Sequence, residues 1–154
     1  YDVVGVNGKI EEKEFLKGLG VKEIISRQDA ADTSGRPMLK ERWAGVIDTV
    51  GGEILATAIK STKLNGNVTC CGNVASPDLP LTVFPFILKG ISLFGIDSQH
   101  CPMHTRVKIW EKLAGDWKLN NLNTIASEIT LDGLDKKIDR MLAGKAKGRT
   151  VVKL

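Results

Sequence analysis

Residues 44–71 read AGVIDTVGGEILATAIKSTKLNGNVTCC, and this stretch decides the fold class. Its first part, Ala44–Val50, is a nearly unbroken apolar run, which is typical of a strand buried on both faces. Apolar side chains between Ile54 and Ile59 then recur at the spacing of one helix face. We expect Gly66 to end that helix and Asn67–Cys71 to form the next strand. The stretch therefore predicts two parallel strands joined by a helix.

The same alternation continues on both sides of this unit. Further strands are expected at Asp2–Val6, Val21–Ser26, Ile91–Ile96 and Thr150–Leu154. Further helices are expected at Glu11–Gly18, Arg106–Trp117 and Leu134–Leu142. Apolar strands that alternate with helices predict a doubly wound α/β domain with a parallel sheet.

Composition excludes several classes of function. The chain has 154 residues, of which 42% are hydrophobic, so one domain with a real core is expected. Its 22 Lys and Arg are scattered among 18 acids, which does not favour a nucleic-acid partner. No apolar run reaches the roughly 20 residues that cross a bilayer, and no signal peptide is recognisable. We expect a cytoplasmic protein without a membrane partner.

Cysteine and histidine usage argues against disulfides and metal. Three cysteines are an odd number, and two of them are adjacent, so reduced thiols are expected. His100, Cys101 and His104 form the only candidate metal cluster, but a fourth ligand is lacking. We therefore predict no metal site.

In an open parallel sheet, ligands bind at the carboxyl ends of the strands. The turn Asn7-Gly8-Lys9 follows the first expected strand, and it carries a cation where an NADH-binding domain carries an acid. Arg27 follows the next strand. These cations favour a cofactor with a 2′-phosphate, although each is also compatible with an ordinary surface position.

A GxGxxG turn, which places a pyrophosphate on a helix, occurs nowhere in the chain. Either this is not a dinucleotide site, or the chain begins after that motif.

Four stretches favour the second alternative. They are WAGVIDTVGGEILA at 43–56, GNVTCCGNV at 66–74, LPLTVFPFILKGISLFGIDS at 79–98 and GKAKGRTVVKL at 144–154. Together they resemble the acrylyl-CoA reductase and quinone oxidoreductase group of the zinc-independent medium-chain dehydrogenases/reductases. The resemblance implies a Rossmann-like doubly wound sheet that lacks its first strand and glycine-rich turn. Residues 1–154 would be a partial dinucleotide-binding domain, in which the helix and strand within 125–154 return toward a substrate domain outside the chain.

The resemblance also implies cofactor contacts. The Asn7-Gly8-Lys9 turn matches the one that grips the 2′-phosphate of NADPH, with a lysine in place of arginine's bidentate fork. The full set of implied cofactor-binding residues is Asn7, Gly8, Lys9, Arg27, Cys71, Gly72, Asn73, Ile87, Asp97, Ser98, Ala143 and Gly144. Cys71 is expected to be inert, because no base accompanies it in the sequence.

The implied activity is hydride transfer from NADPH to an activated alkene, such as an enoyl-CoA or a quinone-like small-molecule acceptor. Catalytic residues are unassigned, because they would lie in the substrate domain, and this chain alone is expected to be inactive. The apolar edge at Ile91–Ile96 suggests a homodimer. The alternatives are a non-catalytic α/β nucleotide-binding or regulatory domain, and a flavodoxin-like module, for which the clustered strand-end acids are missing.

The missing first strand makes one structural prediction. In the strand order 3-2-1-4-5-6, the first strand lies between the second and the fourth. We therefore expect Val3–Val6 and Val46–Thr49 to be separated by a strand from elsewhere, or to pair with each other.

Overall fold

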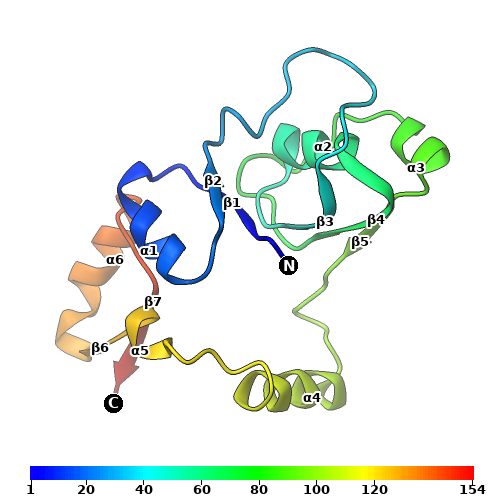
Figure 1. Cartoon of the computed structure of the whole chain (residues 1–154). Helices are drawn as coiled ribbons and strands as arrows, with labels where there is room; N and C mark the ends of the chain where they lie inside the picture. Colours follow the sequence, from blue (N-terminus) through cyan, green and yellow to red (C-terminus); the bar gives the residue numbers. More distant parts are fainter. The chain divides into compact units, whose positions relative to one another are not determined.

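A computed structural model describes the backbone of residues 1–154 and every side chain except that of Ile10. The chain forms two compact units, residues 1–101 and residues 102–154 (Figure 1). Among the described residues, no helix has the length and apolar character that a membrane crossing requires.

The first unit begins with a small parallel sheet. Strand β1 (Val4–Val6) pairs with β2 (Glu23–Ile25). The connection between them contains a 3-10 turn, η1 (Ile10–Glu12), and helix α1 (Lys13–Gly18). Both strands therefore end at the same edge, where the turn after β1 lies beside the segment after β2.

The second sheet of this unit is larger. Strands β3 (Trp43–Asp48), β4 (Thr62–Cys70) and β5 (Ser92–Gly95) are all parallel and lie in the order β3-β4-β5. Helix α2 (Gly52–Lys60) connects β3 to β4, and α3 (Phe84–Lys89) precedes β5. The expected βαβ unit is confirmed.

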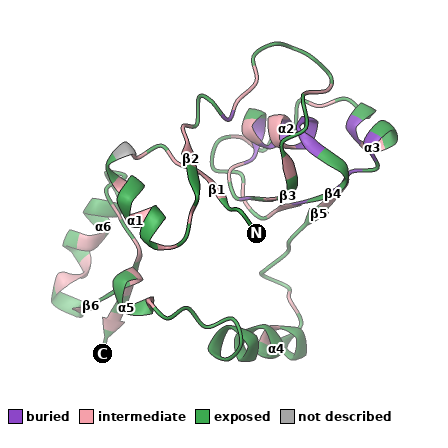
Figure 2. Cartoon of the chain, in the orientation of Figure 1, coloured by how far each residue is buried: buried purple, intermediate pink, exposed green. Residues whose placement is uncertain are grey.

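The core of the first unit lies between α2 and one face of the larger sheet. Leu55 and Ile59 of α2 pack with Val68 of β4 and with Ile91, and all four are buried (Figure 2). On the opposite face of the sheet, the side chain of Ile47 is 84% exposed. Burying an aliphatic side chain contributes about 1.5–3 kcal/mol, so the α2 face holds this sheet together.

The strand order agrees with a Rossmann-like fold. A complete Rossmann sheet has the strand order 3-2-1-4-5-6. The two-stranded sheet β2-β1 corresponds to its strands 3 and 2, and the three-stranded sheet β3-β4-β5 corresponds to its strands 4, 5 and 6. The prediction for the gap between them is wrong in detail. Among the described residues, β1 pairs only with β2, and β3 pairs only with β4. The strands β1 and β3 are therefore not hydrogen-bonded to each other, and no strand of the described chain pairs with both of them.

Two local predictions in this unit also need correction. Helix α2 ends at Lys60, not near Gly66, because the hydroxyls of Ser61 and Thr62 donate to the last helical carbonyls, at 2.6 and 2.7 Å. Gly66 instead lies inside β4, where the register with β3 shifts. Helix α3 was not predicted, although Pro85 in its first turn and Gly90 in a left-handed conformation at its end are the residues expected there.

The second unit consists mostly of helices. It contains α4 (Met103–Ala114), α5 (Leu122–Ile125), strand β6 (Ala126–Thr130), the 3-10 turn η2 (Leu131–Gly133), α6 (Leu134–Leu142) and strand β7 (Arg149–Lys153). Strand β6, which was not predicted, pairs in parallel with β7. Trp117 was expected on α4 but lies beyond its end, where the Lys112 ammonium lies 4.9 Å from the centre of its ring.

Candidate functional site

The turn after β1 is held in one shape by the side chain of Asn7. Its amide nitrogen donates to the Lys9 carbonyl at 2.8 Å, and its amide oxygen accepts the Lys9 backbone N–H at 3.1 Å. The backbone N–H of Asn7 also donates to Ile25 of β2 at 3.0 Å. An Asn side chain that bridges its own turn fixes the direction of the following residue. Lys9 is thereby placed, half-buried, at the strand end.

Arg27 lies against this turn. A Cβ atom at Gly8 would stand 3.2 Å from Nε and 3.4 Å from Cζ of Arg27. Such contacts are tighter than side chains normally tolerate, so the missing side chain of Gly8 lets the guanidinium approach the backbone. The structure thus places Arg27 beside Gly8 in the Asn7-Gly8-Lys9 turn, and the contacts of these residues with a cofactor stay a prediction. Two cations at one edge are suited to an anionic group.

A second candidate region lies at the carboxyl ends of β4 and β5. Residues 70–73 and 95–97 line a shallow cavity of about 500 Å³ there, which is widely open to solvent. Four of the predicted residues, Cys71, Gly72, Asn73 and Asp97, are among them. The sheet topology alone predicted this edge, since ligands of parallel sheets bind where strands end.

The wall of this cavity is built by close backbone packing against the end of β3. The buried carboxylate of Asp48 accepts the backbone N–H groups of Val50 and Gly51, at 3.2 and 2.9 Å. A side chain on Gly72 would collide with the Thr49 carbonyl. The Cys71 thiol donates to the Asp48 carbonyl at 3.4 Å, and not to a base. This geometry gives Cys71 no activation as a nucleophile.

Asp97 forms a hydrogen-bonded pair with His100 that the sequence analysis did not predict. Its Oδ1 accepts the backbone N–H groups of Gln99 and His100, both at 3.1 Å. Its Oδ2 lies 2.7 Å from Nδ1 of His100. The backbone N–H of His100, followed by its imidazole, holds the pKa of the Asp97 carboxyl below the usual 3.8. The loop therefore carries an ionised carboxylate paired with a histidine at the rim of the cavity.

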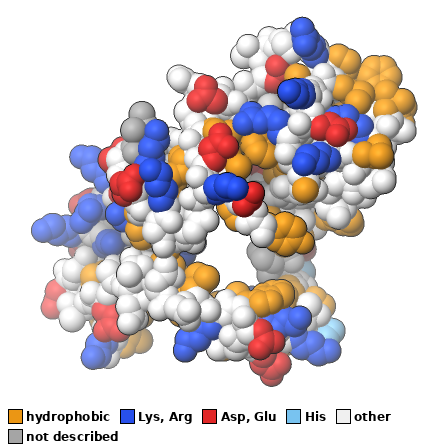
Figure 3. All heavy atoms as spheres, in the orientation of Figure 1, with side chains coloured by type: hydrophobic (Ala, Val, Ile, Leu, Met, Phe, Trp, Pro, Cys, Tyr) orange, Lys and Arg blue, Asp and Glu red, His pale blue; other side chains and the backbone are white. Residues whose placement is uncertain are grey.

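The remaining predicted residues lie outside these two regions. Ile87 is on α3, 68% exposed, where hydrophobic side chains gather on the surface (Figure 3). Ser98 directly follows Asp97. Ala143 and Gly144 end α6 in the second unit, and the left-handed conformation of Gly144 (φ 69°) is what a helix end requires. Their contacts with a cofactor stay predictions.

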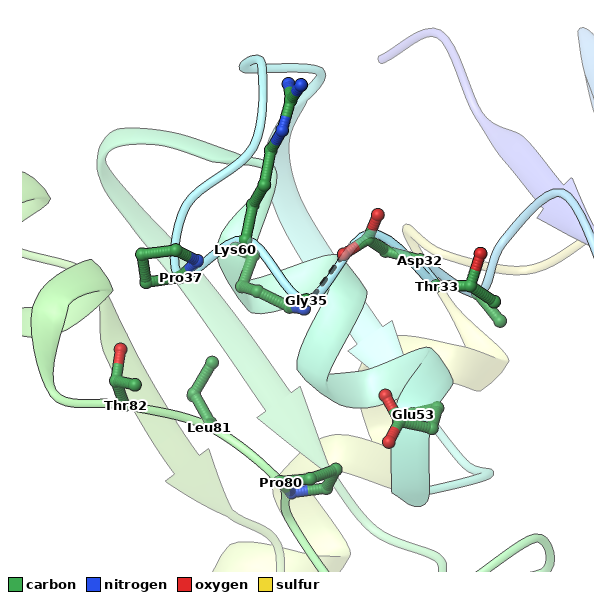
Figure 4. A pocket seen from close by; sticks show the side chains of 11 residues that line it. Asp32, Thr33, Gly35, Pro37, Glu53, Lys60, Pro80, Leu81 and Thr82 are labelled. Atoms are coloured by element: carbon green, nitrogen blue, oxygen red, sulfur yellow. Dashed lines mark hydrogen bonds and ion pairs between the residues drawn. The ribbon is translucent and has the colours of Figure 1, made fainter.

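Another cavity of the first unit lies elsewhere, and none of the predicted residues lines it. It measures about 580 Å³ and is bordered by residues 31–37, by α2 and by residues 80–82 (Figure 4). Asp32 and Lys60 form a nearly buried ion pair of 3.1 Å in its wall. Hydrogen bonds from Ser34, followed by the Lys60 ammonium, hold the pKa of Asp32 below its usual 3.8. The ionised Asp32 carboxylate therefore stabilises the folded state fully at any pH above its unfolded-state pKa. This stabilisation is lost as the pH falls from that value through the lower pKa of the folded state.

Two parallel sheets, one followed by a cationic turn and the other bordered by a cavity at its strand ends, are typical of an α/β protein of the nucleotide-binding type. The family follows from a comparison of sequences. Residues 1–114 match the family described as zinc-binding dehydrogenase, and the chain belongs to that family.

Several relatives resemble the chain along its length. Acrylyl-CoA reductase AcuI of Ruegeria pomeroyi is 36% identical over 99% of the chain. The yhdH oxidoreductase of Salmonella enterica, solved in complex with NADP, is 38% identical with a TM-score of 0.93 over 100% of the chain. Protein yhfP of Bacillus subtilis, solved with NAD bound, is 39% identical with a TM-score of 0.94, also over 100%. The chain spans 46%, 47% and 47% of these relatives, about half of each.

These matches confirm the sequence resemblance and the Rossmann-like fold. The zinc in the family's name has no counterpart in the donor atoms of this chain. Among the described residues, no three His, Cys, Asp or Glu side chains gather in a way that would hold a metal ion. The residues present therefore do not fit a zinc site, and we derive no chemical step through one.

Proposed function

We propose that this chain binds NADPH and forms the nucleotide-binding part of an oxidoreductase that reduces activated alkenes, such as enoyl thioesters, or quinone-like acceptors. The observation that carries the proposal is the approach of Arg27 to the Asn7-Gly8-Lys9 turn, which places two cations at neighbouring strand ends. Relatives crystallised with NADP and named as an acrylyl-CoA reductase support it.

In this proposal, different strand ends bind different parts of the cofactor. Lys9 and Arg27 bind the 2′-phosphate, and the Asn7 side chain orients the turn that carries Lys9. Cys71, Gly72 and Asn73 border the nicotinamide end in the cavity beside β5. NADPH, when bound, supplies the hydride, while the protein positions the acceptor and excludes water.

The activity is tested with the complete gene product. We expect it to oxidise NADPH in the presence of acrylyl-CoA or a benzoquinone. As the resemblance to the zinc-independent group implies, the rate should not change after treatment with a zinc chelator. The isolated 154-residue chain should show no turnover. Absorbance at the NADPH band measures all of these rates. Tight NADPH binding without reduction of either acceptor would contradict the proposal and favour a non-catalytic nucleotide-binding domain.

We also propose that two copies of the protein pair through β5, which is an edge of its sheet. An edge strand offers unpaired backbone groups to a two-fold partner. The residue to change is Phe94, which is 51% exposed. Leu93, also on this strand, is unsuitable because its side chain packs against the core, so a charge there would report on folding.

We expect Phe94→Glu to convert a dimer to monomers at micromolar concentration, since like charges near a two-fold axis repel. Light scattering measures the mass. Phe94→Tyr is the control and should remain dimeric. An unchanged mass for Phe94→Glu would show that this edge is covered in another way.

A further inference from the structure

The pair formed by Asp97 and His100 is placed where a reacting group could use it. Asp97 lines the cavity at the ends of β4 and β5, and His100 is hydrogen-bonded to the same carboxylate. Both side chains are largely exposed, so the imidazole is open to a bound molecule.

Three hydrogen bonds to one carboxylate fix the imidazole. Oδ1 holds the backbone of residues 99 and 100, and Oδ2 faces Nδ1. An ionised carboxylate can only accept, so Nδ1 must carry the proton in this contact. The other ring nitrogen, Nε2, is then left to exchange a proton with a partner. This is the arrangement by which a carboxylate orients a histidine for acid–base work.

We propose that His100, positioned by Asp97, is the acid that protonates the acceptor after hydride has been transferred to it; this inference rests on the proposed function. The acceptor is an α,β-unsaturated thioester. Hydride forms the new bond at its β-carbon, and the electron pair of the double bond moves to give an enolate. The α-carbon then takes the proton from Nε2 of the imidazolium, whose N–H electron pair stays on nitrogen. The neutral imidazole then takes up one proton from solvent. Overall, one hydride from NADPH and one solvent proton are added across the double bond, so atoms and charge balance.

The chain offers a matched control for this role. It contains two histidines, and the second, His104, lies on α4. His100→Gln and His104→Gln make the same chemical change four positions apart. Asp97→Asn keeps the shape of the positioning residue but removes its charge.

The main experiment uses the complete gene product with NADPH and acrylyl-CoA in deuterated water. The wild type should form one configuration at the α-deuterated carbon, because one acid delivers the deuteron to one face. His100→Gln should lower kcat about 10²-fold, the usual contribution of a general acid, and should give a mixture of configurations. Asp97→Asn should also give a mixture. His104→Gln should behave as the wild type.

A second measurement does not depend on turnover. Imidazole ¹⁵N spectra of the protein should show Nδ1 of His100 protonated, and this signature should be lost in Asp97→Asn. Addition of propionyl-CoA, the saturated product, should shift the His100 resonances and leave those of His104 in place. This readout remains available if a His100 variant folds poorly.

The outcomes separate the two proposals. A wild type that reduces no acceptor with NADPH overturns the proposed function, and the role of His100 with it. An active wild type whose His100→Gln variant keeps its rate within 2-fold, together with a single α-configuration, overturns the role of His100 alone. Propionyl-CoA that leaves the His100 resonances unmoved likewise overturns it.

Discussion

Lys9→Glu is expected to weaken NADPH binding about 10²-fold while changing NADH binding by only about 3-fold, because it replaces a cation beside the 2′-phosphate with an acid. Both cofactors share every other contact, so their ratio isolates the 2′-phosphate. Calorimetric titration of the complete gene product with each cofactor measures the effect. The discrimination should shrink as salt rises, since Lys9 is only half-buried.

The control is Lys13→Glu, which makes the same charge change on the exposed surface of α1, one turn further along the chain. It should alter both affinities by less than about 2-fold, because solvent screens distant charges. Arg27→Ala should weaken NADPH binding alone, by about 10-fold, if its guanidinium shares the phosphate with Lys9. Equal losses for NADPH and NADH in Lys9→Glu would show that this turn does not read the 2′-phosphate.

The conservative variant refines the same argument. Lys9→Arg restores the planar fork that binds a phosphate through two parallel hydrogen bonds. It should therefore tighten NADPH binding and leave NADH binding unchanged. One relative of 39% identity was solved with NAD and another of 38% with NADP, so preference within this group needs a direct measurement.

Sequence patterns predicted the elements whose apolar residues follow a clear strand or helix spacing, and missed short elements without such a spacing. The unit β3-α2-β4 was predicted as a strand, a helix and a strand, because its strands are apolar runs and its helix has one apolar face. The end of α2 and the start of β4 were placed about five residues too late along the chain. Strand β6 was missed because its sequence, ASEIT, has a single large apolar residue, Ile129. An exposed strand paired with only one neighbour leaves almost no hydrophobic signal.

The residues of the candidate site could also be predicted only in part from the sequence. The rule that ligands bind at strand ends was enough to single out the Asn7-Gly8-Lys9 turn and Gly72 and Asn73 of the cavity, whereas Cys71 came from the family resemblance. It was not enough to pair Asp97 with His100, because the sequence shows only two polar residues three positions apart in a loop. Their contact depends on how the backbone of residues 97–100 turns, and the hydrogen bonds that set this turn are visible only in the structure.

Lys89 is a charged residue whose burial could not be predicted from the sequence. Lysine is almost always a surface residue, and nothing in the sequence singles out Lys89 at the end of α3 as an exception. In the structure its side chain is only 8% exposed, and its ammonium donates to the carbonyls of Leu39, Lys60 and Thr62 at 3.2–3.3 Å. One ammonium therefore joins the segment before β3, the end of α2 and the start of β4.

We expect Lys89→Met to lower the free energy of unfolding by about 3 kcal/mol, because methionine fills the space but removes three charge-assisted hydrogen bonds to buried carbonyls. Urea unfolding of the complete gene product, followed by circular dichroism, measures the change. Lys63→Met removes a lysine from the exposed surface of β4 and should change the free energy of unfolding by less than about 0.5 kcal/mol.

The Lys89→Met substitution should change NADPH binding much less than it changes the free energy of unfolding. Lys89 bonds to the beginning of β4, whereas the candidate site lies at the carboxyl ends of the strands. Under conditions where Lys89→Met is still folded, its affinity for NADPH should therefore stay within about 2-fold of the wild type, since distant sites are usually independent. An unfolding free energy equal to that of Lys63→Met would mean that water replaces the ammonium at these carbonyls. A selective loss of NADPH affinity in folded Lys89→Met would instead mean that the two ends of the sheet are coupled.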